Sequence, residues 1–589
     1  MGIDVFFLLR KKMSGKRFAR NGVGRFVVAT LCALMIVDVA AQNLGNTVRQ
    51  IDNTQRREQE RAQRELEQLR QKNQKPSGMD TEELLRKPSD KAADATCRDI
   101  DVIEIDGAPN LTDAEREIIS KEFSGRCLNV GEIERLLGEI TRLYLQKGYI
   151  TTRAYLPAQD LSQKKLKILV VEGMTGKIII DDGNKNSVSI INAFPGVEGE
   201  LLNLRDLEQG LDQINRLASN NATMNIAPGQ QPGVSDVIIS NQPGNPFHAY
   251  FSTDNQGTES TGRDQVSVSL TGDNLLGFND MLGVSHRESA YGDREGENST
   301  SDSFNASLPF GYLTLSYGVN YSTYESTVDL PSGLQSQADG INRNHNVLAD
   351  YVVFRDQLSR LSFSAGITNK ESKNYFANQL LTVASRKLTV LDVDANYSIY
   401  ALGGVIRANL GYARGLKIID ALEDPDELPS DIPRAQFHKY KYALGYSLPM
   451  SWGDLPASFS SDIVGQHALD TLYGSEQILI GSIYSVRGFV DNSLSGDDGY
   501  YWRNELAIEP SFQLGNAPIN SRLYTGIDYG NVKARANDAP EGEMSGFTLG
   551  AQFRWQDLTF DIFNTRPISV PNEFEREGSQ TWLGLSYAL

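Results

Sequence analysis

Residues 313–322, LTLSYGVNYS, decide the fold because every second side chain is apolar or aromatic. The odd-numbered positions carry Leu, Leu, Tyr, Val and Tyr, and the even-numbered positions carry Thr, Ser, Gly, Asn and Ser. Successive side chains of a strand point to opposite faces, so this segment predicts a strand with one apolar and one polar face. About sixteen such segments, mostly of about ten residues and separated by Gly, Asp, Asn and Pro turns, fill residues 247–589.

Alternation occurs in soluble β-sandwiches as well as in membrane barrels, and three further features favour a barrel. The segments run in one uninterrupted array, and tyrosines recur at segment ends, where aromatic girdles form. The polar face also carries charges that suit a water-filled lumen, at Asp392, Asp394, Arg503, Glu505 and Asp528. We therefore predict a mainly β protein with a 16-stranded antiparallel outer-membrane β-barrel over residues 247–589.

The N-terminus reads as an export signal. Basic residues from Arg10 to Arg25 precede an apolar run over residues 26–41, which ends Val-Ala-Ala before Gln42. This pattern predicts a signal peptide over residues 1–41, with either Met1 or Met13 as the start and an N-terminal membrane anchor as the alternative.

Charge and hydropathy exclude two classes of protein. The net charge is −18, and removal of a segment carrying about +5 makes it more negative, which argues against binding of nucleic acid. Mean hydropathy is −0.36, and beyond residue 41 no apolar run reaches the roughly 20 residues of a spanning helix.

Residues 42–72 have helix-forming composition but are polar on all sides, so core packing cannot hold them. A solvated arm, a coiled-coil fragment and a helix in a water-filled cavity all fit this composition. Residues 73–95 contain two prolines and many charges, as a linker does.

Two small α/β units of about 75 residues follow, over residues 96–173 and 174–246. The first reads as a strand at 100–106, two helices that begin after Thr112 and Asn129, and strands at 150–157 and 165–173. Cys32 lies in the signal peptide, which leaves Cys97 and Cys127 in an oxidising compartment, and we expect them to form a disulfide.

An ordered set of motifs resembles a known family from about residue 44 to the end. These are the runs GYITTRAYLPAQDL (148–161), NRL (215–217), PGQQPGVSD (228–236), DNQG (254–257), TG (261–262), VRGF (486–489), GYYWRNEL (499–506) and GIDYG (526–530). The set is similar to the two-partner secretion transporters, the TpsB or haemolysin secretion/activation proteins, which are related to the filamentous haemagglutinin transporter.

The resemblance implies an outer-membrane pore of a Gram-negative bacterium that exports one large secreted exoprotein. Residues 96–173 and 174–246 would be periplasmic POTRA domains that capture the unfolded cargo, of adhesin, haemolysin or toxin type, which then crosses the barrel lumen without ATP. Residues 42–72 would form a plug helix in the lumen. The other partners implied are outer-membrane lipid and the barrel assembly machinery during biogenesis.

The loop that carries VRGF is expected to fold back into the barrel. Residues 470–499 have no sustained alternation, and long loops of this kind are usually functional. Strand parity turns Glu505 and Asp528 toward the lumen. We therefore expect Arg487 to pair with Asp528, with Glu505 nearby; the other members of the motif are Val486, Gly488, which allows a sharp turn, and Phe489, which packs beside the wall.

No enzyme motif stands out. The five histidines are scattered without metal-ligand spacing, and no nucleophile elbow, phosphate-binding Gly-rich loop or zinc-protease motif occurs. We expect a non-enzyme without cofactor or metal. Two alternatives stay open: an outer-membrane assembly insertase of the same superfamily, which usually carries more POTRA domains, and a passive porin.

Overall fold

The computed structural model describes residues 57, 96–183, 187–290, 296–329, 335–515, 517–536, 539–572 and 574–589. The predicted signal peptide (1–41) and linker (73–95) lie outside the described residues, as does the predicted plug helix (42–72) except for Arg57. No helix among the described residues combines the length and apolarity that a transmembrane helix needs.

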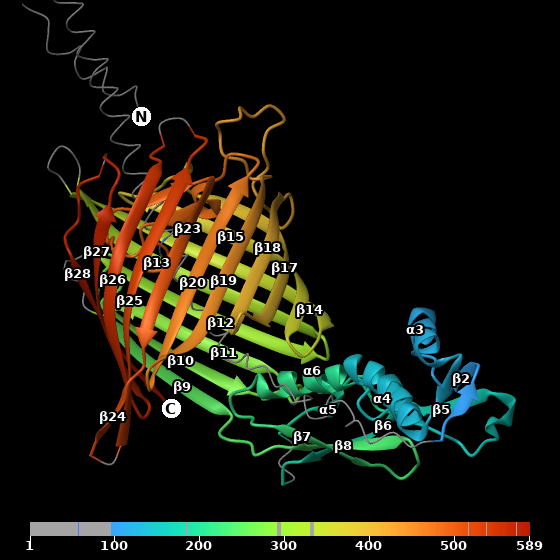
Figure 1. Cartoon of the computed structure of the whole chain (residues 1–589). Coiled ribbons are helices and arrows are strands. Elements are labelled where there is room, and N and C mark those ends of the chain that lie inside the picture. The colour runs from blue at the N-terminus through green and yellow to red at the C-terminus, as the bar shows by residue number, and fades with distance from the viewer. Residues whose placement is uncertain are drawn as a thin grey trace, which may run out of the picture.

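A closed antiparallel barrel forms the C-terminal part of the chain (Figure 1). The ladder contains eighteen strands, but β16 (Gln379–Leu380) and β24 (Ser511–Leu514) are short, and β15 pairs directly with β17 and β23 with β25, which leaves sixteen strands in the wall. The prediction of a 16-stranded antiparallel barrel is confirmed. The wall strands are β9 (Phe247–Asp254), β10 (Gln265–Asp273), β11 (Met281–Ser289), β12 (Asn298–Phe310), β13 (Leu313–Asp329), β14 (Gln335–Arg355), β15 (Ser359–Phe376), β17 (Arg386–Ala401), β18 (Gly404–Leu416), β19 (His438–Trp452), β20 (Leu455–Ala468), β23 (Asp498–Ile508), β25 (Ala517–Lys533), β26 (Gly542–Trp555), β27 (Leu558–Ser569) and β28 (Gln580–Ala588).

Several strands are longer than the ten or so residues expected from alternation. Strands β13, β14 and β15 have 17, 21 and 18 residues. A tilted strand crosses the hydrocarbon layer in about 9–11 residues, so these ladders continue past it. In β13 the apolar parity changes in this extension, because Tyr324 and Val328 are buried whereas the apolar residues from Leu313 to Tyr321 occupy odd positions, and this change hides the continuation from a reading of alternation.

The two faces of the wall follow the sequence parity. Leu583, Leu585 and Tyr587 of β28 are exposed on the outer surface, as an apolar band facing lipid requires. Trp582, one position away, is 2% exposed; it stacks on Phe563 inside the barrel.

The first α/β unit, residues 96–173, contains two sheets and two helices. Its elements are β1 (Arg98–Ile100), β2 (Val102–Asp106), α3 (Asp113–Phe123), β3 (Arg126–Leu128), α4 (Val130–Gln146), β4 (Arg153–Tyr155), the 3₁₀ turn η1 (Leu161–Gln163) and β5 (Lys165–Val171). The main sheet has the order β2-β5-β4, with β2 and β5 parallel. Leu136, Ile140 and Tyr144 of α4 pack on it with no exposed surface.

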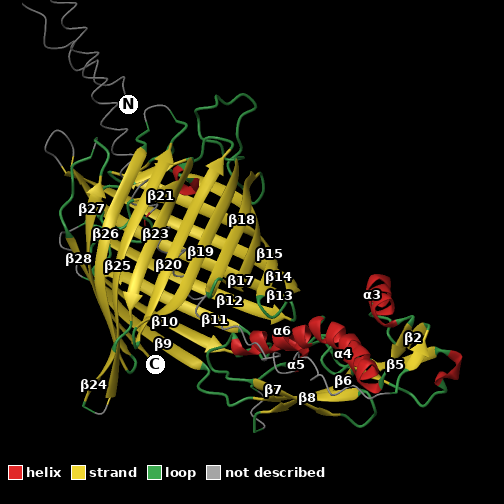
Figure 2. Ribbon diagram, viewed as in Figure 1, coloured by secondary structure: helices red, strands yellow, loops and turns green. Residues whose placement is uncertain are grey.

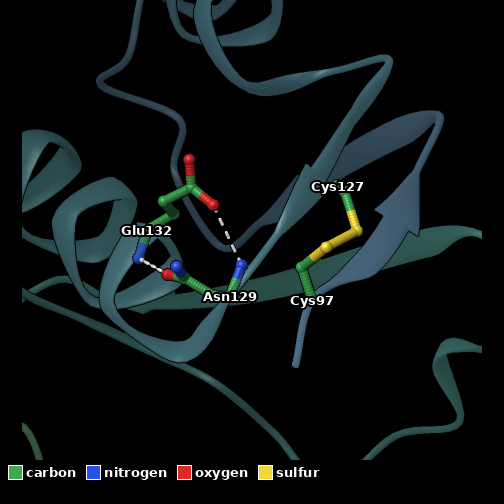
Figure 3. The surroundings of a disulfide bond; sticks show 4 residues. All are labelled: Cys97, Cys127, Asn129 and Glu132. Carbon is green, nitrogen blue, oxygen red and sulfur yellow. Dashed lines mark hydrogen bonds between the residues drawn. A yellow bond between two sulfur atoms is a disulfide. The ribbon is translucent and has the colours of Figure 1, made fainter. Parts of the chain in front are cut away.

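The prediction of one strand over residues 100–106 is wrong. The chain breaks at Asp101, so that β1 leaves the main sheet and pairs with β3 as a separate two-stranded ribbon. Cys97 and Cys127 are bonded to each other at this ribbon, with 5.3 Å between their Cα atoms (Figure 3). The apolar positions change from even (Ile100, Val102) to odd (Ile103, Ile105) just after Asp101, and a single strand cannot keep both sets on one face.

The second unit, residues 174–246, repeats the arrangement without a disulfide. Its elements are β6 (Met174–Asp181), α5 (Ile190–Ala193), α6 (Leu204–Asn215), β7 (Thr223–Pro228) and β8 (Val234–Ser240), with the sheet order β6-β8-β7. Figure 1 shows α4 and α6 nearly end to end, with α6 next to the barrel and α3 far from it. Ile150 of the first unit is buried in the core of the second, so the two units share a packed junction.

Candidate functional site

A loop between β20 and β23 fills part of the barrel lumen. It contains the 3₁₀ turn η2 (Gly474–Glu476) and a small hairpin of β21 (Ile478–Ile480) and β22 (Leu494–Gly496). Figure 2 shows β21 within the barrel outline, toward the end opposite the α/β units. Ile480, Val486 and Phe489 are buried with Tyr501 of β23 and Val532 of β25, so the loop has an apolar core shared with the wall.

Arg487, at the turn of this loop, lies against two acidic side chains of the wall. Its Nε donates to Oδ2 of Asp528 at 2.6 Å and its Nη2 donates to Oδ1 at 2.9 Å, which is a two-point guanidinium–carboxylate contact. Its Nη1 donates to Glu505 Oε2 at 2.7 Å, and its backbone N–H donates to Asp528 Oδ2 at 3.1 Å. The side chains of Arg487 and Asp528 are 5% and 0% exposed, so water screens this ion pair weakly.

Three glycines make room for this contact. A Cβ at Gly526 of β25 would collide with Nη2 of Arg487, and a Cβ at Gly546 of β26 would collide with its backbone carbonyl. Gly488 has a φ of 123°, which disfavours other residues, and a Cβ there would lie 2.8 Å from the carbonyl oxygen of Arg566. The loop therefore lies so close to the wall that a side chain at any of these three positions would make the two collide.

Two further arginines complete the surroundings. Arg522 Nη2 donates to Glu505 Oε1 at 2.5 Å, so Glu505 is shared between Arg487 and Arg522. Arg503 Nη1 donates to the carbonyl of Tyr484 at 2.9 Å and so binds the loop backbone from the wall. The cluster fixes the position of the loop, and none of its groups has the arrangement of a nucleophile and a base.

The structure thus brings Val486, Arg487, Gly488 and Phe489 together with Asp528 and Glu505, whereas Cys97 and Cys127 lie in the first α/β unit. Sequence reasoning missed Arg522, although parity on β25 could have indicated it, and it missed Glu577. The carboxylate of Glu577 accepts hydrogen bonds from the backbone N–H groups of Val490 (2.6 Å), Asp491 (3.2 Å) and Asn492 (2.6 Å). It comes from the loop after β27, and no local signal marks it. Within the described ranges no group of three or more His, Cys, Asp or Glu side chains could hold a metal ion.

A second candidate site lies on the first α/β unit, at the outer edge of β2. A cavity of about 320 Å³ beside this strand is lined by Ile103, Ile105, Arg116, Glu117, Ile119 and Ser120. The N–H of Val102 donates toward β5, to Lys164 O, and N–H groups alternate in direction along a strand, so those of Ile103 and Ile105 point to the outer edge. Arg116 Nη1 of α3 donates to the carbonyl of Ile105 at 3.0 Å, so an added strand would have to displace that one side-chain contact. An exposed edge of this kind can pair with an extended peptide.

The corresponding edge of the second unit is covered. The segment 199–202 lies against β6, where Thr175 N–H donates to Glu200 O at 2.8 Å and Gly199 N–H donates to Thr175 O at 2.9 Å. Glu198 Oε1 accepts from the N–H of Ile178 at 2.7 Å. An incoming strand would have to displace these bonds.

Comparison with known proteins agrees with this architecture. Residues 233–553 match the model of the haemolysin secretion/activation protein ShlB/FhaC/HecB family, residues 99–173 match the ShlB-type POTRA domain, and residues 176–228 match a POTRA domain. The outer membrane transporter CdiB of Dickeya dadantii is 32% identical over 87% of this chain and 90% of its own length. The hemolysin transporter protein ShlB of Serratia marcescens is 32% identical over 88% of this chain and 90% of its own.

Solved structures show the same fold. CdiB from Escherichia coli superposes with a TM-score of 0.83 at 28% identity, and the match covers 91% of this chain and 98% of that one. CdiB from Acinetobacter baumannii, at 22% identity, superposes with a TM-score of 0.74 over 92% of this chain and 99% of that one. These matches confirm the family, the transport function and the outer-membrane location predicted from the sequence, with the POTRA domains in the periplasm. Since the family model spans more than half of the chain and the relatives match along most of it, the chain belongs to the haemolysin secretion/activation protein family, the outer-membrane transporters of two-partner secretion.

Proposed function

We propose that this transporter captures one unfolded exoprotein at the β2 edge of the first POTRA domain (POTRA 1, residues 96–173) and passes it through the barrel. The observation that carries the proposal is the edge of β2, which among the described residues has no strand paired to it and lies beside a cavity lined by three isoleucines and three polar side chains, in the domain that lies farther from the barrel. An extended segment that adds to β2 would bind through its main chain, while Ile103, Ile105 and Ile119 would select apolar side chains.

The cargo class follows from the relatives. Their names describe a hemolysin transporter and CdiB outer membrane transporters, and we assign to this chain a large secreted partner of haemolysin, adhesin or toxin type. Transport needs no nucleotide chemistry, and we assign the chain no catalytic activity, no cofactor and no metal. Two POTRA domains and relatives that are transporters argue against the assembly insertase and the porin.

The lumen loop would be the moving part of the pore. A guanidinium held by two carboxylates in a dry contact keeps one position, because breaking a buried pair by removing one partner costs roughly 3–5 kcal/mol. Arg487, Asp528 and Glu505 would therefore hold the resting loop against the wall, with Val486, Gly488 and Phe489 shaping the turn.

The N-terminal segment would act as a plug. Arg57 Nη2 donates to the carbonyl of Asp491 at 2.8 Å and Nη1 contacts the carbonyl of Val490, so residue 57 reaches the lumen loop. This contact favours a plug over a free periplasmic arm for residues 42–72. Deleting residues 42–72 should raise single-channel conductance without loss of assembly. Residues 1–41 would serve as the signal peptide, and the apolar outer band of the barrel would contact lipid after insertion by the barrel assembly machinery.

The test of capture is a proline in the edge strand. Ile103→Pro removes the outward N–H of residue 103, and Ile103→Ala removes the side chain but keeps that N–H. With the exoprotein co-expressed, Ile103→Pro should lower its binding to the transporter and its amount in the medium at least tenfold, whereas Ile103→Ala should lower them much less. Equal losses in the two variants would show that side-chain contacts, and not strand pairing, hold the cargo. Full secretion by Ile103→Pro would place capture elsewhere.

A further inference from the structure

A second buried ion cluster holds the lumen loop, at its first turn. Glu476, the last residue of η2, has a side chain only 3% exposed. Lys370 Nζ lies 2.7 Å from its Oε1 and Lys439 Nζ lies 3.1 Å from its Oε2. Lys439 Nζ also donates to the backbone carbonyl of Glu476 at 2.7 Å. This turn of the loop is therefore held by its side chain and its backbone together.

The two lysines lie on a different arc of the wall from the partners of Arg487. Lys370 is in β15 and Lys439 is in β19, with β17 and β18 between them in the strand order. The partners of Arg487 are in β23 and β25. Glu476 thus links strands that do not touch each other, and the loop is fastened at two separate places.

Glu476 forms ion pairs with both Lys370 and Lys439, whereas the neighbouring acids of the wall pair with another lysine. The next acids along this wall, Asp392 and Asp394 of β17, lie 2.6 and 3.4 Å from Lys441 Nζ. The side chains of Lys439 and Lys370 are 9% and 16% exposed. Neutralising Glu476 would leave two ammonium groups without their carboxylate partner and poorly hydrated, and the turn would lose the attraction that holds it to the wall.

We propose that Glu476 is a second positioning residue of the transporter, and that Glu476 and Arg487 contribute separately to holding the loop in the closed state of the pore. Glu476 acts through the loop and does not contact cargo. The proposal rests on the role of the lumen loop as the moving part of the pore. Because the two contacts share no partner, loss of each should raise the probability of opening independently.

Single-channel recording of the purified full chain in planar bilayers tests this without any cargo. Glu476→Gln keeps the shape of the side chain and removes its charge. Asp392→Asn is the control, because it removes a lumen charge whose ion pair with Lys441 joins two wall strands and does not include the loop. Glu476→Gln should raise the open probability about tenfold, Arg487→Ala should do the same, and in the double variant the two increases should multiply. Asp392→Asn should stay near the wild type.

Two results would overturn the proposal: an open probability of Glu476→Gln equal to that of Asp392→Asn, or a double variant no more open than Arg487→Ala. Heat-modifiable migration in gels checks that each barrel has assembled. Should Glu476→Gln not assemble, Lys370→Gln decides, because it keeps the Lys439 contact; it should give a smaller increase, and no increase would reject the second anchor. The bilayer recording does not measure export. If the wild-type transporter secreted no co-expressed exoprotein, the proposed export function would be rejected separately.

Discussion

The two POTRA domains share a fold but differ in what holds them. POTRA 1 is closed by the Cys97–Cys127 disulfide and, within the part of the chain that the structure describes, has no backbone segment paired to its β2 edge, where Arg116 alone contacts the carbonyl of Ile105. The second POTRA domain (POTRA 2, residues 174–246) has no cysteine, covers its β6 edge with residues 199–202 and is fastened to the barrel through α6. One domain is thus stabilised from within and free to bind, while the other is stabilised by its neighbours and positions the first.

The contacts of α6 with the barrel explain this division. Gln209 and Gln213 both donate to the carbonyl of Gly311, at 3.2 and 3.0 Å, in the turn between β12 and β13. Arg355, at the end of β14, lies 2.5 Å from Asp212 Oδ2 and 3.6 Å from Glu208 Oε2. The side chains of Arg355 and Glu208 are 8% and 2% exposed, so this junction excludes water like a core.

Removal of the disulfide should have the largest effect, and only on POTRA 1. The bond closes a loop with a sequence separation of 30, for which chain entropy predicts about 3–4 kcal/mol of stabilisation. Hydrogen exchange of the full chain with Cys97→Ala and Cys127→Ala together should show faster exchange in α3 and α4 and unchanged exchange in α6. Equal acceleration in both domains would mean that they unfold as one unit and that the disulfide stabilises both.

Loss of Arg355 should loosen the contact of POTRA 2 with the barrel, at a somewhat smaller cost in free energy than loss of the disulfide has for POTRA 1. Breaking a buried ion pair costs roughly 3–5 kcal/mol, and we expect about 3 kcal/mol for Arg355→Ala because Glu208 keeps its contact with Arg205 at 2.6 Å. The measurement is the distance distribution between spin labels on POTRA 2 and a barrel turn, which should broaden.

The matched control for that variant lies in POTRA 1. Arg135 pairs with Glu122 at 2.9 Å, but both side chains are about half exposed. Arg135→Ala should therefore cost less than about 1 kcal/mol and leave the distances unchanged. A narrow distribution in Arg355→Ala would show that the glutamine contacts with Gly311 suffice to hold the junction.

How far the sequence predicts these features depends on whether the signal is local. Alternation predicts the barrel because every strand carries its own pattern, and the same parity turns Asp528 and Glu505 inward. It does not predict that β14 reaches 21 residues, since pairing with a partner strand decides that length. Likewise Glu208 and Arg355 each look like ordinary surface charges, and only the fold brings them together. Glu476 was missed for the same reason.

The smallest predicted effect concerns how each domain uses an acid in the first turn of a helix. In POTRA 2 this acid is Asp206 of α6, which accepts a hydrogen bond of 2.6 Å from the hydroxyl of Tyr312 on the barrel. In POTRA 1 it is Glu115 of α3, which caps its own helix through the N–H of Thr112 at 2.8 Å and binds Lys147 Nζ at 2.7 Å. The same helix position therefore serves the domain itself in one case and the junction in the other.

This difference makes POTRA 1 sensitive to acid through Glu115. Burial acts to raise the pKa of Glu115, but the hydrogen bonds from Lys147 and Thr112 outweigh it and hold the pKa below its usual value. A carboxyl whose folded pKa is depressed stabilises the fold above its unfolded pKa, and this contribution is lost as the pH falls through the folded value. Between pH 6 and pH 3, α3 should lose protection from hydrogen exchange, after correction for intrinsic rates, more steeply in the wild type than in Glu115→Gln. Because Glu115 is partly solvated, we expect a shift of less than about 1 kcal/mol, and parallel pH profiles of the two proteins would show that the charge of Glu115 contributes nothing to the stability of the domain.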